Sequence, residues 1–282
     1  MRIKLHYFLF QLTLAATLGA CSTATHQIAD GTEAVRPPGL AAAGLYAASQ
    51  PEHFAQQCTS ALEGLGTALE GLAGQDTLAL NYLRQVDEFL VDLDNSYNIA
   101  QLYAQVHPEP AMRESAANCQ QALSNLFTEF TLSAGIFERL QQLDSTAARS
   151  DTRRFHTQLL RDYRRAGVDQ SAATREQIRA LNEQITALGQ AFSKHIREDV
   201  RSVRVTERSQ LAGMPQDYID ALQRDGNDWL ISTDYPEIFP LLSYAHNDAL
   251  RKRIYIEFLN RGYPDNDETL LQIIQLREQL AQ

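Results

Sequence analysis

The residues from Ala172 to Asp199 carry the pattern that most narrowly limits the fold of this chain. Apolar side chains recur there at alternating spacings of three and four, while Arg, Asn, Glu and Gln occupy the other faces. The apolar positions are Ile178, Leu181, Ile185, Leu188 and Phe192. A stripe with this period predicts one long amphipathic helix. We expect this helix to pack antiparallel against neighbouring helices, as in a bundle or an elongated coiled pair.

The same helical period extends over most of the chain from Pro51 onward. We expect a helix to begin at Pro51, where proline suits a first helical position. Further helices are expected near 77–105, 111–143, 151–166, 239–245 and 248–260, and from 267 to the end. Val203, Val205 and residues 229–232 predict short strands. The expected fold class is mainly α: an elongated multi-helix lobe with a short β excursion near residues 203–232.

The first twenty residues have the composition of an export signal. Arg2 and Lys4 precede an apolar stretch from Tyr7 to Leu18, which is too short to span a bilayer. Leu18-Gly19-Ala20-Cys21 is typical of a bacterial lipoprotein, so we expect residues 1–20 to be removed and Cys21 to carry lipid. The alternative is an ordinary cleaved signal followed by an incidental cysteine.

This interpretation also predicts the location and the organisation of the chain. Ser22 in the second mature position favours the outer membrane, with the protein lipid-anchored in the bacterial cell envelope and facing the periplasm. Residues 21–44 are rich in Ala, Thr, Gly and Pro and predict a flexible tether. Residues 45–282 are expected to form the helical region. Gln282 lies inside the last helical pattern, so we expect the chain to be truncated at its carboxyl end.

Charge and cysteine content limit the partners and the cross-links. The formal net charge is −10, and removal of Arg2 and Lys4 with the signal would change it to −12, which argues against nucleic acid as a partner. Cys58 and Cys119 would remain beside a lipidated Cys21. An even remainder permits a disulfide in an oxidising periplasm, whereas two separate buried thiols are equally compatible with the sequence.

The sequence contains none of the short motifs that would supply catalysis. A zinc peptidase of the His-Glu-x-x-His type needs two imidazoles at helical spacing, yet no two of the seven histidines lie within five residues of each other. His195, Glu198 and Asp199 are the nearest approach to a metal-binding group, and a solvated helix face explains them better. No Gly-x-Ser-x-Gly or phosphate-binding loop occurs either. We therefore predict no catalytic and no metal-binding residue in this chain.

Six short strings between Arg153 and Gln282 nevertheless resemble, in order, those of the thimet oligopeptidase family of zinc metallopeptidases, which includes oligopeptidase A and peptidyl-dipeptidase-like members. His195 stands where the family commonly has Asn. Residues 45–152 fit the family only loosely. The strings are Leu160–Gly167, Phe192–Asp199, Gln210–Tyr218, Tyr235-Pro236 with Pro240, Leu250-Arg251-Lys252 with Asn260-Arg261-Gly262, and Leu270-Leu271 with Leu276-Arg277.

The resemblance implies a mostly helical, two-lobed enzyme whose deep channel admits short peptides. The family's zinc ligands and catalytic glutamate would lie beyond residue 282. The chain would then be the amino-terminal portion of a periplasmic lipoprotein zinc metallo-oligopeptidase, without bound zinc and inactive alone. The alternative is a non-catalytic helical lipoprotein that acts as a peptide-binding or scaffold module. A third possibility is a generic helical bundle with an accidental likeness.

Overall fold

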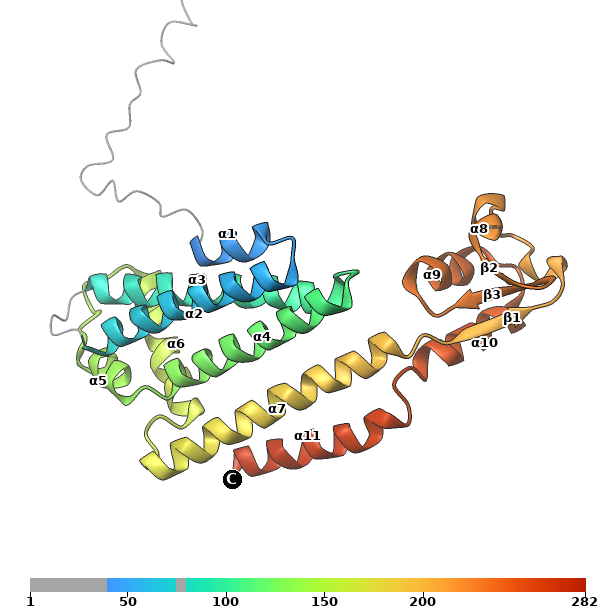
Figure 1. Cartoon of the computed structure of the whole chain (residues 1–282). Helices are drawn as coiled ribbons and strands as arrows, with labels where there is room; N and C mark the ends of the chain where they lie inside the picture. Colours follow the sequence, from blue (N-terminus) through green and yellow to red (C-terminus); the bar gives the residue numbers. More distant parts are fainter. Residues whose placement is uncertain (1–39, 75–79) are drawn as a thin grey trace, which may run out of the picture. The chain divides into compact units, whose positions relative to one another are not determined.

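A computed structural model describes residues 40–74 and 80–282, which belong to one compact unit. These residues form helices, one 3-10 turn and one small sheet, so the expected mainly α fold class is confirmed (Figure 1). The elements are α1 Leu40–Ala47, α2 Pro51–Gly74, α3 Leu80–Val106, α4 Pro110–Thr131, α5 Ala134–Gln142, α6 Ser150–Ala166, α7 Ala172–Glu198, β1 Ser202–Val205, η1 Arg208–Leu211, α8 Gln216–Ala221, β2 Gln223–Asp225, β3 Asp228–Ser232, α9 Tyr235–Tyr244, α10 Asp248–Leu259 and α11 Asp265–Ala281.

The first six helices share one apolar core. The long helices α2, α3 and α4 pack on one another, and their apolar stripes meet where Phe54, Val86 and Leu123 are completely buried. α5 adds Ile136 and Leu140, which are equally inaccessible to solvent. Helices of this length bury apolar side chains at every turn, so the core extends along them.

The helix expected over residues 111–143 is interrupted, which corrects that prediction. α4 ends at Thr131, and the backbone N–H of Leu132 bonds to the Thr128 carbonyl at 3.0 Å. Ser133 then starts α5, because its side-chain oxygen accepts a hydrogen bond from the backbone N–H of Ile136. The apolar period continues across the break, and for this reason periodicity alone does not reveal it.

The folded body begins earlier than the sequence suggests. α1 starts at Leu40, inside the segment 21–44 expected to be a tether, and Leu45 is fully buried in the core of the first helices. The Tyr103 hydroxyl donates a hydrogen bond to the Tyr46 carbonyl at 3.0 Å. The tether prediction therefore fails for residues 40–44. Residues 21–39 lie outside the described part of the chain, as do the proposed signal and Cys21.

The long helix predicted from the apolar stripe is α7, and α11 runs antiparallel beside it, as predicted (Figure 1). Ser171 caps α7 by accepting a hydrogen bond from the backbone N–H of Thr174 at 3.1 Å. α7 also packs against α4. No residue of α7 is fully buried, and Leu270 and Ile274 of α11 remain about half exposed. The stripe of α7 is therefore only half covered within the described residues.

A second, smaller core surrounds the sheet. The strand order is β1-β3-β2, and both pairings are antiparallel, with Val203 opposite Ile231. Val205, Leu211, Ile231, Ile238 and Leu241 are buried beneath it. The strands β1 and β3 match the predicted β excursion. The strand β2 was not predicted, because all three of its residues are polar and exposed.

Candidate functional site

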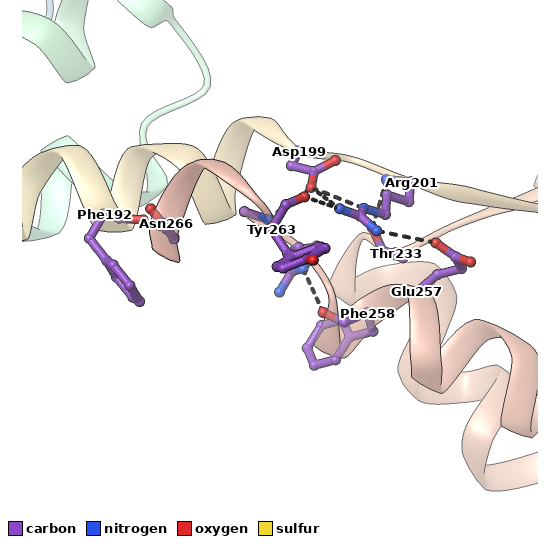
Figure 2. Close-up of polar contacts among 10 residues, drawn as sticks. Phe192, Asp199, Arg201, Thr233, Glu257, Phe258, Tyr263 and Asn266 are labelled. Carbon is purple, nitrogen blue, oxygen red and sulfur yellow. Dashed lines mark hydrogen bonds and ion pairs between the residues drawn. The ribbon is translucent and has the colours of Figure 1, made fainter. Parts of the chain in front are cut away.

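A set of polar contacts connects the end of α7 to the start of α11, and we call it the Asp199 junction (Figure 2). Its residues are Asp199, Arg201, Thr233, Glu257, Gly262 and Tyr263. The Arg201 guanidinium donates to Asp199 Oδ2 from Nε at 3.0 Å and from Nη2 at 2.8 Å. Nη2 also donates to the Tyr263 carbonyl at 2.7 Å. One arginine thus joins the start of the β region to the turn before α11.

The remaining contacts use the carboxylates and the backbone. The Arg201 backbone N–H donates to Thr233 Oγ1 at 3.1 Å, and the Thr233 N–H returns a bond to the Arg201 carbonyl at 2.8 Å. Glu257 Oε2 lies 3.6 Å from Arg201 Nη1. The Gly262 N–H donates to Asp199 Oδ2 at 2.8 Å. Asp199 therefore accepts from both a side chain and the backbone.

These contacts fix the charge state of the junction. The hydrogen bond from the Arg201 side chain is the main reason that the pKa of the Asp199 carboxyl lies below its usual value, and the Gly262 N–H lowers it further. The same bond raises the pKa of Arg201. Asp199 is therefore ionised at neutral pH, and its carboxylate is occupied by hydrogen bonds. This suits it to stabilise the turn and not to act as a general base.

A second layer of contacts lies one turn away along α7. His195 Nδ1 donates to Asn266 Oδ1 at 2.8 Å. Asn266 Nδ2 donates in turn to the Phe192 carbonyl at 3.1 Å (Figure 2). Asn266 is buried at the start of α11. Gly262 has a φ of +80°, and a Cβ atom there would also lie 3.1 Å from Ile196 Cγ1. Only glycine fits this turn without strain.

The junction brings together two of the strings on which the family resemblance depends. Phe192–Asp199 supplies the end of α7, and Asn260-Arg261-Gly262 supplies the turn before α11. A third string, Gln210–Tyr218, contains another tight approach. Gly213 there has a φ of +93°, and a Cβ atom would collide with the Tyr244 carbonyl oxygen. The strings therefore mark positions where backbone segments meet, which is a structural role.

The arrangement of His195, Glu198 and Asp199, the trio considered from the sequence, does not suit a metal ion. The His195 ring is bonded to Asn266, and the Asp199 carboxylate is bonded to Arg201 and Gly262. Across residues 40–74 and 80–282, no three His, Cys, Asp or Glu side chains are grouped to hold a metal. Zinc, which the family resemblance implies, has no matching ligand set in this part of the chain.

The most deeply buried histidine of the described residues forms two hydrogen bonds within the core. His156 has its Nδ1 atom 2.9 Å from Ser145 Oγ and its Nε2 atom 2.7 Å from the Leu140 carbonyl. It is 6% exposed and connects α6 to α5 and the loop that follows. Neither ring nitrogen is left for a metal or a substrate, so His156 is a core residue.

The two remaining cysteines are joined. Cys58 of α2 and Cys119 of α4 form a disulfide, with Cα atoms 5.9 Å apart, and both residues lie in the first core. The sequence left this bond and two separate thiols open, because spacing along the chain does not give distance. A bonded cysteine has no thiolate, which excludes both residues as nucleophiles in this state. The predicted lipidation site Cys21 lies outside the described residues.

Sequence reasoning missed an aromatic cluster on the surface near the junction. Tyr235 and Phe239 of α9 contact each other and Phe258 of α10, with ring centroids 5.2 to 6.1 Å apart. Arg261 stacks on them, with Cζ 4.2 Å from the centroid of Phe258 and 5.5 Å from that of Tyr235. Tyr235 and Phe239 are more than half exposed. Their spacing of four was the available signal, but the partner on α10 is distant in sequence.

Comparison with known proteins identifies the class to which this fold is related. No family model matches the chain. Curated relatives are peptidases, and they confirm the resemblance to the thimet oligopeptidase family.

Three relatives illustrate the match. Saccharolysin of Saccharomyces cerevisiae is 24% identical over 214 residues, which cover 71% of this chain and 30% of that protein. Oligopeptidase A of Salmonella typhimurium is 22% identical over 258 residues, or 84% of this chain and 38% of that protein. Mitochondrial intermediate peptidase of Mycosarcoma maydis is 21% identical over 272 residues, which cover 83% of this chain and 30% of that protein. The chain spans only about a third of the length of these relatives.

Proposed function

We propose that this chain is the amino-terminal portion of a zinc metallo-oligopeptidase that hydrolyses short peptides. The observation that carries the proposal is the similarity to peptidases over 71 to 84% of the chain. Two of the three relatives are named as an oligopeptidase and a peptidase, and the chain covers about a third of the length of all three. A mainly helical portion is consistent with one wall of a peptide channel.

The zinc site of the proposed enzyme would lie outside residues 1–282. Zinc in such a peptidase activates a bound water for attack on the peptide carbonyl. The seven histidines of this chain include no pair at helical spacing, and the described residues contain no group suited to a metal. The described residues would contribute structurally, because the Asp199 junction and the α7–α11 pair would stabilise the wall of the peptide channel.

Zinc content and hydrolysis of the purified chain test this proposal. We expect residues 21–282 to contain no stoichiometric zinc by elemental analysis and to leave short fluorogenic peptides intact. One tightly bound zinc per chain, together with hydrolysis that a chelator abolishes, would contradict the proposal. The coding DNA past codon 282 is a second test. A His-Glu-x-x-His string there supports the enzyme, whereas unrelated sequence favours the scaffold lipoprotein.

We further propose that the protein is anchored by lipid at Cys21 and faces the periplasm. The proposal is supported by Leu18-Gly19-Ala20-Cys21 after an apolar run. Among residues 40–74 and 80–282, no helix has the length and apolarity needed to cross a bilayer. A Cys21→Ser variant tests the anchor, because it should lose incorporation of labelled fatty acid and leave the membrane fraction. Labelling that persists in this variant would refute the anchor.

A further inference from the structure

A pocket between α3 and α4 is not used by the Asp199 junction or by any catalytic group. It encloses about 490 Å³, within the range of roughly 300–1,000 Å³ that is usual for small-molecule sites. α3 contributes Leu90, Leu93, Asp94 and Tyr97, and α4 contributes Leu123, Ser124 and Phe127. Leu93 and Leu123 are buried at its base, whereas Phe127 is 49% exposed. The pocket is therefore an apolar hollow that is open to solvent.

Three polar groups on the wall limit what the pocket can bind. Asp94 accepts a hydrogen bond from Asn98 at 2.9 Å and has no cationic partner among the described residues. The Tyr97 hydroxyl accepts from Gln120 Nε2 at 3.0 Å, which leaves its own hydrogen available to a ligand. Ser124 Oγ lies 3.2 Å from Thr186 Oγ1 of α7. The carboxylate is thus the one full charge on an otherwise neutral lining.

The two helices that form the walls are poor in cations over the whole length of the pocket. Residues 85–112 contain no lysine or arginine, and neither do residues 114–138. α3 carries Asp87 and Asp92 in addition to Asp94, and also Glu88, which is paired with Arg84 one turn before it. α7 approaches the pocket at Thr186, and the nearest cations along it, Arg179 and Lys194, are about two turns from that residue. The pocket therefore lies in a locally anionic surface, which favours a cationic ligand.

We propose that this pocket binds an apolar group that carries an ammonium ion. The apolar group would fill the space between Leu93, Leu123 and Phe127, and the ammonium would pair with the Asp94 carboxylate. A free aliphatic amine has this chemistry, and so does the amino end of a peptide whose first side chain is apolar. The proposal does not depend on the proposed peptidase function.

Matched probes separate the charge from the apolar contact. Octylamine, which is protonated at pH 7, and neutral octanol have the same chain of eight carbons. We expect octylamine to bind residues 21–282 about fivefold more tightly than octanol, as measured by NMR titration. Leucyl-leucine amide and its N-acetylated form make the same comparison for a peptide. Binding by octylamine alone identifies a free amine as the ligand, and binding by both cations shows that a peptide end is admitted.

Three variants locate the site. Asp94→Asn should weaken octylamine about fivefold and leave octanol unchanged, because only the charge is removed. Phe127→Ala should weaken both probes, because it removes apolar contact. Glu129→Gln is the control: it removes an exposed carboxylate of α4 that does not line the pocket and should change neither affinity. Circular dichroism checks that each variant is folded.

Several results would overturn the proposal. If octanol binds as tightly as octylamine, the ammonium charge does not contribute to binding. An Asp94→Asn chain that retains full affinity for octylamine would place the cation elsewhere. Octylamine binding that survives Phe127→Ala would place the apolar chain elsewhere, and an absence of binding by every probe would leave the pocket without a ligand of this class.

Discussion

The first helical region, α1–α6, and the β region, β1–α10, stabilise their cores in different ways. The helical region buries apolar side chains along its long helices and cross-links two of them through Cys58 and Cys119. The β region has a smaller core and no cysteine. Its strands are tied at the edge by charged contacts, with Arg204 paired to Asp225 and Asp228. The comparison teaches that long helices bury apolar side chains along their whole length, whereas a sheet of three short strands buries one apolar face against the helices beside it.

Loss of the disulfide should have the largest effect and should be confined to the helical region. The bond closes a loop with a sequence separation of 61, and the chain-entropy relation gives about 4 kcal/mol for a loop of this size. The variant with Cys58→Ala and Cys119→Ala should therefore lower the urea midpoint of the helical circular dichroism signal. Trp229, the one tryptophan, reports the β region by fluorescence. If the Trp229 midpoint shifts by the same amount, the two regions unfold together and the contrast is wrong.

A smaller side chain in the core of the β region should destabilise that region and leave the helical region largely unchanged. Ile231 is completely buried in β3, and Ile231→Ala should cost about 3 kcal/mol through lost burial and a residual cavity. The Trp229 transition should move to lower urea while most of the helical signal stays in place. Leu230→Ala, on the half-buried face of the same strand, is the matched control and should cost clearly less. Equal losses in the two variants would contradict the assigned core face.

The Asp199 junction should contribute to the free energy of unfolding by an amount that depends on pH. Asp199→Asn should reduce the free energy of unfolding by about 1.5 kcal/mol at pH 7, because the partly exposed ion pair with Arg201 is lost. The pKa of Asp199 is lowered in the folded state, so this stability is present above the unfolded pKa near 4. It is lost as the pH falls through the folded pKa.

Urea titrations of both chains at several pH values measure this difference. The gap between wild type and Asp199→Asn should be complete at neutral pH and should narrow below about pH 4. Asp234→Asn is a suitable comparison, because it changes an exposed carboxylate of the β region that forms no ion pair with the described residues. A gap that stays constant down to strongly acidic pH would show that the ionised Asp199 carboxylate does not stabilise the fold.

Two tyrosine hydroxyls, one buried and one partly buried, give the smallest expected loss of stability and allow the two regions to be compared directly. Tyr82 donates to the Leu72 carbonyl at 3.0 Å in the helical region, and Tyr218 donates to the Glu237 carbonyl at 2.8 Å in the β region. Tyr82→Phe and Tyr218→Phe should each cost about 1 kcal/mol, the net value of one hydrogen bond. The loss in Tyr82→Phe should appear in the helical circular dichroism signal, and the loss in Tyr218→Phe should appear in the Trp229 fluorescence. A loss that appears in the signal of the other region would argue against two separate cores.

The same two residues should respond to alkali. Burial raises the pKa of Tyr82 to about 12, and burial followed by the charge of Glu237 raises that of Tyr218. Because the folded pKa exceeds the unfolded value of 10.0, the stability that each neutral hydroxyl provides is complete below pH 10 and is lost as the pH rises through the folded pKa. Absorbance titration of tyrosinate should therefore show one late-ionising group fewer in each phenylalanine variant.

Much of the secondary structure was predictable from the spacing of apolar residues. The stripe from Ile178 to Phe192 predicted α7, and Pro51 marked the first residue of α2. The break between α4 and α5 was missed because the apolar period continues through Ser133. The strand β2 was missed because Gln223, Arg224 and Asp225 have no apolar alternation, which is the signal that predicts a strand from sequence.

The candidate site was predictable in its residues but not in its arrangement. The strings Phe192–Asp199 and Asn260–Gly262 were recognised as similar to a known family, yet nothing in either string shows that they meet. The bond between the Gly262 N–H and Asp199 Oδ2 joins positions separated by 63 residues. The pocket beside Asp94 was not predicted for the same reason, since its walls come from two helices.

The sequence by itself determined the helical period, the short strands at β1 and β3, the relationship to oligopeptidases and the lack of a histidine pair. These are local properties, because side-chain period and spacing are set within a few turns of chain. Only the tertiary structure decided that Cys58 bonds to Cys119, that Arg201 holds the turn before α11, and that Asp94 stands beside an open apolar pocket. Each of these depends on the distance between segments far apart along the chain, which packing alone fixes.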